Sequence, residues 1–263
     1  MAQYISLYSG SSGNCSLVVE DGKFIIIDMG KSARLTTKAI NDVGLDMKNL
    51  QGILVSHEHS DHTAGLNVFL KKLAVPLYTN SCTLDYLADN SLIPGHIDAQ
   101  DIDFTGSNIG PFFVEGFDTP HDSVGCMGFK IHTQKGTSMA IATDLGCVTN
   151  HIYDKLQGNE LVVLESNYDE QMLKEGPYPQ YLKVRISSNR GHLSNAQSSV
   201  TTLKLIDNGV KKIQLCHLSN TNNTPSLALQ QIVDMAERNG IVIGQDVSIR
   251  PNRRHEITLP AEF

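Results

Sequence analysis

Potential metal ligands are concentrated in the six-residue segment His57-Glu-His-Ser-Asp-His62. Imidazole and carboxylate groups are typical ligands of zinc, manganese or iron, and no cysteine lies nearby to indicate a structural thiolate site. Ligands on one short loop are gathered at little cost in chain entropy. A polar surface loop that carries histidines by chance is the alternative, and the density of ligands argues against it. We therefore predict a metal site whose first ligands are His57, His59, Asp61 and His62.

A buried strand at residues 52–56 is predicted to lead directly into this segment, which places the ligands on a turn at a strand end. Other strands are predicted where runs rich in Val, Ile and aromatic residues are bounded by Gly, Asp, Asn or Pro. They cover residues 3–7, 16–20, 23–28, 75–79, 112–117, 128–132, 138–142, 161–165, 212–216 and 247–250.

Helices are predicted between these strands, at residues 32–43, 63–73, 82–90, 150–156, 194–208 and 225–239. The last has Thr224 as its N-cap, Pro225 in its first turn and Gly240 just past its end, the expected asymmetry of helix ends. No linker, repeat or low-complexity segment interrupts the alternation of strands and helices. We therefore expect one α/β domain over residues 1–263.

The composition is typical of a globular protein. The 263 residues are 40% apolar and 19% charged, enough to bury one sizeable core or two small ones. The N-terminus lacks a cationic start followed by an apolar stretch, so no signal peptide is expected. The aliphatic-aromatic run at 24–27 is far shorter than a membrane span. Five scattered cysteines with no C-x-x-C pair favour small buried thiols in a reducing cytoplasm over a disulfide framework.

The formal net charge is −7, which is unfavourable for a protein that binds nucleic acid. Two bound dications would change it to −7 + 4 = −3. Positive charge is also clustered, at Lys183, Arg185 and Arg190 and again at Arg250, Arg253 and Arg254. These clusters are either ordinary solvated surface or substrate contacts. Lys183 and Arg185 are the candidates for contacts.

The motifs resemble those of the metallo-β-lactamase superfamily, whose signature is H-x-H-x-D-H after a strand. The resemblance extends over essentially the whole chain. It implies an αββα sandwich, in which two mixed sheets are flanked by helices and the ligands lie along one edge. Asp28 resembles the acid that holds the metal loop in place, while His121, Asp144 and His217 match the later motifs in order.

By this resemblance, the chain is a two-metal hydrolase. One ion would be held by His57, His59 and His121, the other by Asp61, His62 and His217, and Asp144 would bridge them together with a water or hydroxide. Zinc or manganese is expected, with iron as an alternative. Two ions roughly 3.5–4 Å apart suit phosphodiester hydrolysis, because they stabilise both the attacking and the leaving oxygen.

Further segments, at residues 9–14, 164–167, 176–186, 191–195 and 217–223, resemble the YycJ (WalJ) group of this superfamily. That group implies a 5′–3′ exonuclease acting on double-stranded DNA. Tyr168 departs from the histidine that is common there, so no role is assigned to it. A small-molecule hydrolase acting on a cyclic phosphodiester, lactone or thioester is the alternative, which the acidic net charge favours. A non-catalytic binding protein is a third, which the full ligand set disfavours.

His192, in Gly191-His-Leu-Ser-Asn195, resembles the histidine of ribonuclease Z that pairs with a glutamate and protonates the leaving 3′ oxygen. Glu165, at a predicted strand end, is the matching acid. We predict catalytic roles for this pair and for Asp61. The alternative is that His192 caps the following helix and Glu165 is a surface acid.

The segment at residues 9–14 is rich in Gly and Ser. Its backbone amides could bind a phosphate, in which case Ser11 and Asn14 would contact substrate. A tight turn between two strands, where glycine is conformationally required, is the equal alternative.

Overall fold

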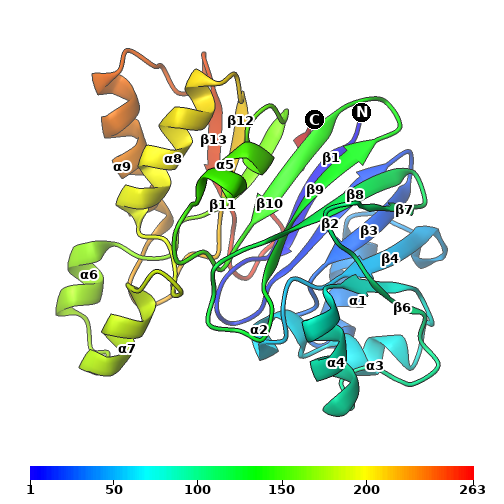
Figure 1. The fold of residues 1–263 in the computed structure, drawn as a ribbon. Coiled ribbons are helices and arrows are strands. Elements are labelled where there is room, and N and C mark those ends of the chain that lie inside the picture. Colours follow the sequence, from blue (N-terminus) through cyan, green and yellow to red (C-terminus); the bar gives the residue numbers. More distant parts are fainter.

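Two mixed seven-stranded sheets face each other in the computed structural model, which describes residues 1–263 (Figure 1). The first has the order β14-β1-β2-β3-β4-β5-β6 and the second β13-β12-β11-β10-β9-β8-β7. The strands of the first sheet are β1 (Gln3–Tyr8), β2 (Cys15–Glu20), β3 (Lys23–Ile27), β4 (Leu50–Leu54), β5 (Leu77–Thr79), β6 (Ala99–Asp101) and β14 (Ala261–Glu262). Those of the second are β7 (Ser107–Ile109), β8 (Phe112–Asp118), β9 (Met127–Thr133), β10 (Ser138–Ala142), β11 (Leu161–Glu165), β12 (Lys212–Cys216) and β13 (Ser248–Pro251).

Helices cover the outer face of each sheet. The first sheet packs against α1 (Ala33–Asp42), α3 (Leu66–Leu70) and α4 (Ser81–Asp89), and the second against α5 (Asn150–Leu156), α8 (Asn195–Asp207) and α9 (Pro225–Arg238). The short α2 (Ser60–Thr63) and a 3₁₀ turn at Met47–Asn49 lie in loops of the first half. Helices α6 (Glu170–Glu175) and α7 (Gln180–Ile186) lie together below α8 and α9 in Figure 1.

Three hydrophobic cores hold these four layers together. The central core joins apolar side chains from both sheets, such as Ile25 and Leu54 from the first and Phe129 and Val163 from the second. The outer cores bury one apolar face of each helical layer against its sheet. Burial of apolar surface in three layers is what stacks two sheets and two sets of helices. The predicted αββα class is therefore confirmed.

Two predictions for this region are wrong in part. The helix predicted at 63–73 is reduced to α3 (Leu66–Leu70), and the ligand segment predicted to be a turn contains the short α2 (Ser60–Thr63), which includes Asp61 and His62. α2 ends at Thr63 and α3 begins at Leu66. Gly65, between them, donates its N–H to the carbonyl of Met29, and a Cβ at this position would lie 2.0 Å from the Lys31 carbonyl oxygen. Close backbone packing at Gly65 thus separates the helices.

Besides α2 and the 3₁₀ turn at Met47–Asn49, five short elements escape the sequence prediction, namely β6, β7, β14, α6 and α7. α7 buries none of its residues, so it has no apolar face to produce a helical period. The predicted start and stop of the last helix are confirmed, since Thr224 caps α9, Pro225 is its first residue and Gly240 follows the C-cap Asn239 with a φ of +73°. No helix is long and apolar enough to cross a membrane.

Candidate metal centre

The predicted ligands converge on one edge of the sandwich, where several strands have their carboxyl ends. His57 follows β4, His121 follows β8, Asp144 follows β10 and His217 follows β12 directly. β3 and β4 are parallel neighbours, as are β10, β11 and β12, so their ends meet at the same edge. Polar side chains just after such strand ends are placed close together by the sheets themselves.

Three residues of this edge have left-handed backbone conformations that non-glycine residues rarely adopt. The φ angles are +61° at Asp28, +56° at Asp144 and +53° at His217. Such a conformation costs on the order of 1–3 kcal/mol and persists where surrounding contacts impose it. Each residue turns the chain sharply out of its strand, which brings the side chain back over the sheet edge.

The first group of ligand atoms belongs to His57, His59 and His121. Nε2 of His57 lies 3.0 Å from Nδ1 of His59, and the ring of His121 lies 5.2 Å, centre to centre, from each of the other two. Nδ1 of His121 is 3.0 Å from the carbonyl oxygen of Gly191, and Nδ1 of His57 is 3.0 Å from Oγ of Ser56. These contacts leave Nε2 of both rings free to face the group.

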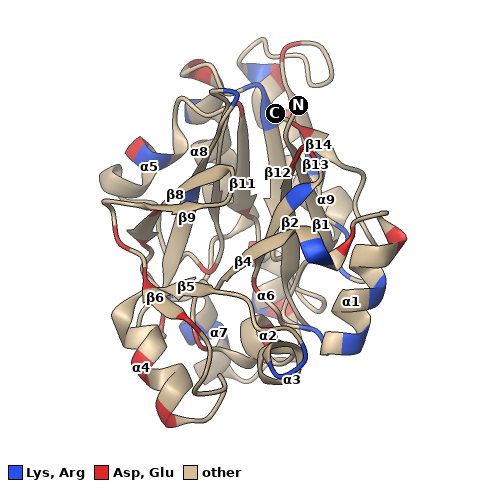
Figure 2. Ribbon diagram, turned by 90° about the vertical axis from the view of Figure 1, so that its right-hand side faces the viewer, with Lys and Arg blue, Asp and Glu red and all other residues tan.

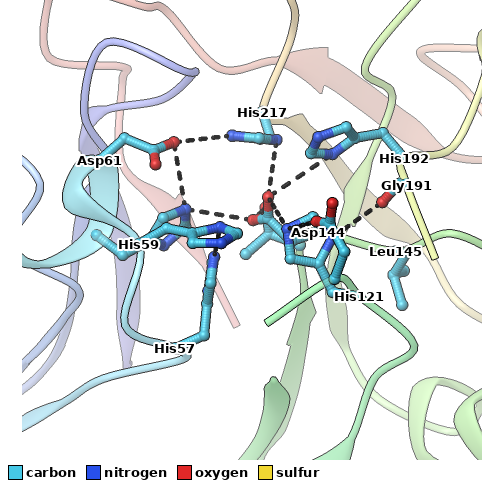
Figure 3. Close-up of polar contacts among 12 residues, drawn as sticks. His57, His59, Asp61, His121, Asp144, Leu145, Gly191, His192 and His217 are labelled. Carbon is cyan, nitrogen blue, oxygen red and sulfur yellow. Dashed lines mark hydrogen bonds and ion pairs between the residues drawn. The ribbon is translucent and has the colours of Figure 1, made fainter. Parts of the chain in front are cut away.

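The second group belongs to Asp61, His62 and His217, of which Asp61 and His217 are labelled in Figure 3. Oδ2 of Asp61 lies 3.6 Å from Nε2 of His62 and 3.5 Å from Nε2 of His217. Asp144 lies between the two groups, with Oδ2 at 3.3 Å from Nε2 of His62 and Oδ1 at 3.7 Å from Nε2 of His121.

These distances fit the binding of divalent metal ions. Nitrogen and oxygen ligands of tetrahedral zinc lie at 2.0–2.2 Å from the ion, and hence about 3.4 Å from one another. The nitrogens of His57 and His59, 3.0 Å apart, and Oδ2 of Asp61, at 3.6 and 3.5 Å from Nε2 of His62 and of His217, lie within about half an ångström of that spacing. All donor atoms of each group lie within 4.8 Å of one another. The donors are imidazole and carboxylate groups, as divalent transition metals prefer. The site therefore suits divalent metal ions.

Burial and close carboxylates set the charges of this cluster. Burial lowers the pKa of His62, but Asp28 and Asp144 outweigh burial and raise it well above its usual value. Burial also lowers the pKa of His217, but the neighbouring carboxylates of Asp144, Asp61 and Glu165 raise it to about 10. Burial and the neighbouring His62 lower the pKa of His57. Without metal, the second group thus holds protons that metal ions would displace.

Asp28 has the position expected of an acid that supports the metal loop. Its Oδ2 lies 2.7 Å from Nδ1 of His62 and accepts a hydrogen bond from Oγ of Ser56, while its Oδ1 accepts one from the Ser56 amide. The carboxylate thereby orients the His62 ring and directs Nε2 toward the ligand group.

His192 and Glu165 are in contact, with Nδ1 at 2.8 Å from Oε1. Glu165 is completely buried, and its Oε1 also lies 2.8 Å from Nδ1 of His217. Burial raises the pKa of Glu165, but His192 and His217 outweigh it, so the pKa is lowered and the carboxyl is ionised. Ser194 caps α8, in a capping box with Gln197. The helix-cap alternative for His192 is therefore unsupported.

The loop at residues 9–14 brings Asn14 but not Ser11 to the cluster. Asn14 is buried, with Nδ2 at 3.0 Å from Nε2 of His62 and Oδ1 accepting a hydrogen bond from the Gly10 amide. Ser11 is exposed. Gly13 has a φ of +137°, and a Cβ there would lie 2.5 Å from the Gly30 carbonyl oxygen. The tight-turn explanation for glycine in this loop is thus supported.

Around the cluster lie Asp122, which the sequence analysis did not single out, and members of the predicted cationic cluster at Lys183, Arg185 and Arg190. Asp122 follows His121 and forms an ion pair with Arg185 of α7. The guanidinium of Arg190 donates two hydrogen bonds to the carbonyl oxygen of His121. Lys183 instead donates to the carbonyl of Lys174, away from the ligands. Of the two predicted cationic contacts, only Arg185 borders the cluster.

Comparison with known proteins agrees with this geometry. Residues 24–217 match the family described as the beta-lactamase superfamily domain. Exodeoxyribonuclease YycJ of Bacillus anthracis is 34% identical over 248 residues, which cover 92% of each chain. Exodeoxyribonuclease WalJ of Streptococcus pneumoniae strain D39 is 30% identical over 251 residues, covering 94% of this chain and 93% of that protein.

A solved structure has the same architecture at much lower sequence identity. The metallo-beta-lactamase fold protein YhfI from Bacillus subtilis superposes with a TM-score of 0.70. The match covers 99% of this chain and 100% of that one, at 12% identity. Such a likeness establishes the fold alone.

Proposed function

The chain belongs to the beta-lactamase superfamily, and on that premise we propose that it is a metal-dependent nuclease that hydrolyses phosphodiester bonds. Its relatives over nine-tenths of the chain are named exodeoxyribonucleases, which supports DNA as the substrate and removal of nucleotides from an end. The observation that carries the proposal is the pair of ligand groups joined by Asp144, with the His192–Glu165 pair beside them. Digestion of double-stranded DNA in the 5′–3′ direction follows from the likeness to the YycJ group.

We assign one ion to His57, His59 and His121, a second to Asp61, His62 and His217, and a bridging role to Asp144. Zinc or manganese suits these donors, with iron as the alternative. When bound, two such ions lower the pKa of a bound water and stabilise charge on the attacking and leaving oxygens.

The protein residues orient the ligands and supply a proton. Asp28, Ser56 and the Gly191 carbonyl contact Nδ1 of three ligand rings and so direct each Nε2 toward the cluster. Asp61 has a side chain that is 24% exposed, which leaves this carboxylate within reach of water and substrate.

His192 is the proton donor in this proposal. Ionised Glu165 accepts a hydrogen bond from Nδ1, stabilises positive charge on the ring and leaves Nε2 to protonate the leaving 3′ oxygen. The His192 side chain is 17% exposed, whereas that of Glu165 is fully buried, so His192 is the member of the pair that substrate can reach.

The test is digestion of end-labelled single- and double-stranded DNA, RNA and a small phosphodiester ester, with manganese or zinc added. We expect stepwise release of nucleotides from the 5′ end of duplex DNA. Turnover of the small ester without degradation of any polymer would instead identify a small-molecule hydrolase. The reducing cytoplasm is the proposed compartment, and it is consistent with five free cysteines.

A further inference from the structure

A cavity of about 580 Å³ borders the first ligand group and has no role in the catalytic proposal. It lies between the segment that follows β6, the N-terminal end of α4 and the loop that joins β8 to β9. Its lining includes His121, one of the proposed metal ligands, and Arg190. The volume lies within the usual range of ligand pockets, about 300–1,000 Å³.

Apolar side chains line the cavity both inside and at the surface. Ile102 and Met127 are buried, whereas Phe104 is 59% exposed and Val124 is 49% exposed. Exposed apolar side chains that gather beside a cavity indicate a binding site. The ring of Phe104 suits the flat face of a nucleobase, because bases stack on aromatic side chains regardless of their sequence.

Two hydroxyl groups in the lining are left without a good hydrogen-bond partner. Oγ1 of Thr119 and Oγ of Ser123 are buried, and neither has a partner apart from the weakly interacting thiol of Cys126 beside Thr119. Buried polar groups are nearly always hydrogen-bonded, so such hydroxyls beside a cavity indicate a ligand or an ordered water. A hydroxyl both donates and accepts, which suits the carbonyl and N–H groups along the edge of a base.

The charged side chains of the lining are mostly acidic. Asp101, Asp103 and Asp118 are exposed, and Figure 2 shows acidic residues in red at β6 and on α4. The guanidinium of Arg190 donates to the carbonyl oxygen of His121. Carboxylates repel phosphates and accept hydrogen bonds from N–H groups. The cavity therefore suits an uncharged ring with N–H donors, which every DNA base has, and disfavours a backbone phosphate.

The cavity also adjoins the side of the cluster that serves the leaving group. His121 lines it, and the ring of His121 lies 5.1 Å, centre to centre, from that of His192, the proposed proton donor. In 5′–3′ digestion, the 3′ oxygen that leaves belongs to the nucleotide being removed. That nucleotide therefore lies on the His192 side of the scissile phosphate, beside the cavity.

We propose that this cavity binds the base of the terminal nucleotide being removed, with Phe104 stacking on its face and Thr119 hydrogen-bonding to its edge. The proposal rests on the proposed nuclease function and names the nucleotide-binding part of the same site. A terminal base must leave its stack and its pairing partner before the nucleotide is released, which costs free energy. Stacking on Phe104 offsets part of that cost, so base binding contributes to the rate of digestion.

The experiment compares Phe104→Ala and Thr119→Val with the wild type on two duplexes that differ only in their 5′-terminal nucleotide. One duplex ends in thymidine and the other in an abasic tetrahydrofuran nucleotide, which keeps the backbone but has no base. The ratio of kcat/KM at the two ends measures base binding, and the cost of unpairing cancels when this ratio is compared between variants. We expect Phe104→Ala to lower the ratio about 5- to 150-fold, the range for a lost base–aromatic stack. Thr119→Val should lower it roughly 2- to 10-fold, as for one hydrogen bond.

Tyr181→Ala is the matched control, because it also removes an exposed aromatic ring, 75% exposed on α7, which does not line the cavity. Its ratio should equal that of the wild type. Phe104 is itself more than half exposed, so its removal should leave the fold intact. An unchanged ratio in Phe104→Ala would overturn the base pocket and leave the nuclease assignment standing. Wild-type protein that degrades neither duplex would overturn both.

Discussion

At the scale of single residues, Glu165 contacts both the proposed proton donor and a proposed metal ligand. Its Oε1 contacts the rings of His192 and His217, and its Oε2 accepts hydrogen bonds from the amides of Leu145 and Leu193. All four partners favour the ionised carboxyl, which explains why a charge survives complete burial. One carboxylate thus holds a proposed metal ligand and the proposed proton donor in a fixed relation.

Replacing His192 by Ala tests the proton donor. Turnover on DNA should fall by roughly 10²–10⁴, the usual contribution of a positioned acid, while metal content stays the same. On an ester with a p-nitrophenolate leaving group the loss should be much smaller, because that weakly basic oxygen needs little protonation. Steady-state rates on both substrates provide the measurement. Equal losses on the two substrates, or loss of a metal ion, would exclude the acid role.

Metal binding should release protons at neutral pH. His217 has a pKa raised to about 10 in the metal-free fold, against 6.5 in the unfolded chain, so the ring is protonated at pH 7. That proton stabilises the metal-free fold fully below pH 6.5, and the contribution is lost as the pH rises through about 10. A metal ion must displace it, so affinity should increase with pH over this window. Calorimetry in buffers of different ionisation enthalpy measures the release, and a value of zero at pH 7 would contradict the predicted charge state.

At the scale of elements, α8 supports the segment that carries His192. The capping box of Ser194 and Gln197 fixes the start of the helix, and the amide of Leu193, one residue before the cap, donates a hydrogen bond to Glu165 at the end of β11. α8 then buries Leu205 and Ile206 against the second sheet, so the His192 loop is attached to a rigid layer. Sites positioned by packed elements keep their geometry better than sites on free loops.

Ser194→Ala separates this structural support from catalysis. Loss of an N-cap should lower the free energy of unfolding by about 1 kcal/mol. Turnover on DNA and on the activated ester should change little and by the same factor, since Ser194 contacts neither ligand group. Denaturant unfolding and the two rate measurements check this. A loss confined to the DNA substrate would show that the cap contributes to the acid function.

At the scale of the whole molecule, the cluster joins the two halves of the sandwich. His57, His59, Asp61 and His62 come from one loop after the first sheet, whereas His121, Asp144 and His217 come from the second sheet. With Asp144 as the bridge, each proposed ion would therefore take two ligands from each half. A bound ion would link the sheets across the open edge of the central core.

We accordingly expect about two transition-metal ions per chain and a strong effect of metal on stability. A ligand present at 1,000 times its dissociation constant stabilises the fold by about 4 kcal/mol, so a chelator should lower the melting temperature by several degrees. Elemental analysis and thermal unfolding measure both. Asp144→Ala should loosen the second ion and abolish turnover, because it removes the proposed bridge. One ion or none after reconstitution would contradict the two-metal assignment.

The sequence by itself determined which residues carry the chemistry and which fold positions them. Ligands within a six-residue segment lie close together in any fold, so the metal-binding segment at residues 57–62 could be recognised without a structure. The later motifs, in their order along the chain, indicated the αββα sandwich. Strand ends were predictable because apolar runs stop at polar residues. The role of each assigned ligand and the single domain stay predictions.

The resemblance had predicted that Glu165 pairs with His192 and that Asp28 supports the metal loop. Only the tertiary structure shows that Glu165 also contacts His217, 52 positions away in the chain, and that Asp28 acts through His62 and Ser56, at separations of 34 and 28. Helices α6 and α7 were not predicted either, because α7 buries none of its residues and so shows no apolar helical period. Contacts between distant segments depend on how two sheets stack and on left-handed turns at three strand ends. Local residue patterns predict neither the stacking of the sheets nor these turns, because both are set by the packing of the whole chain.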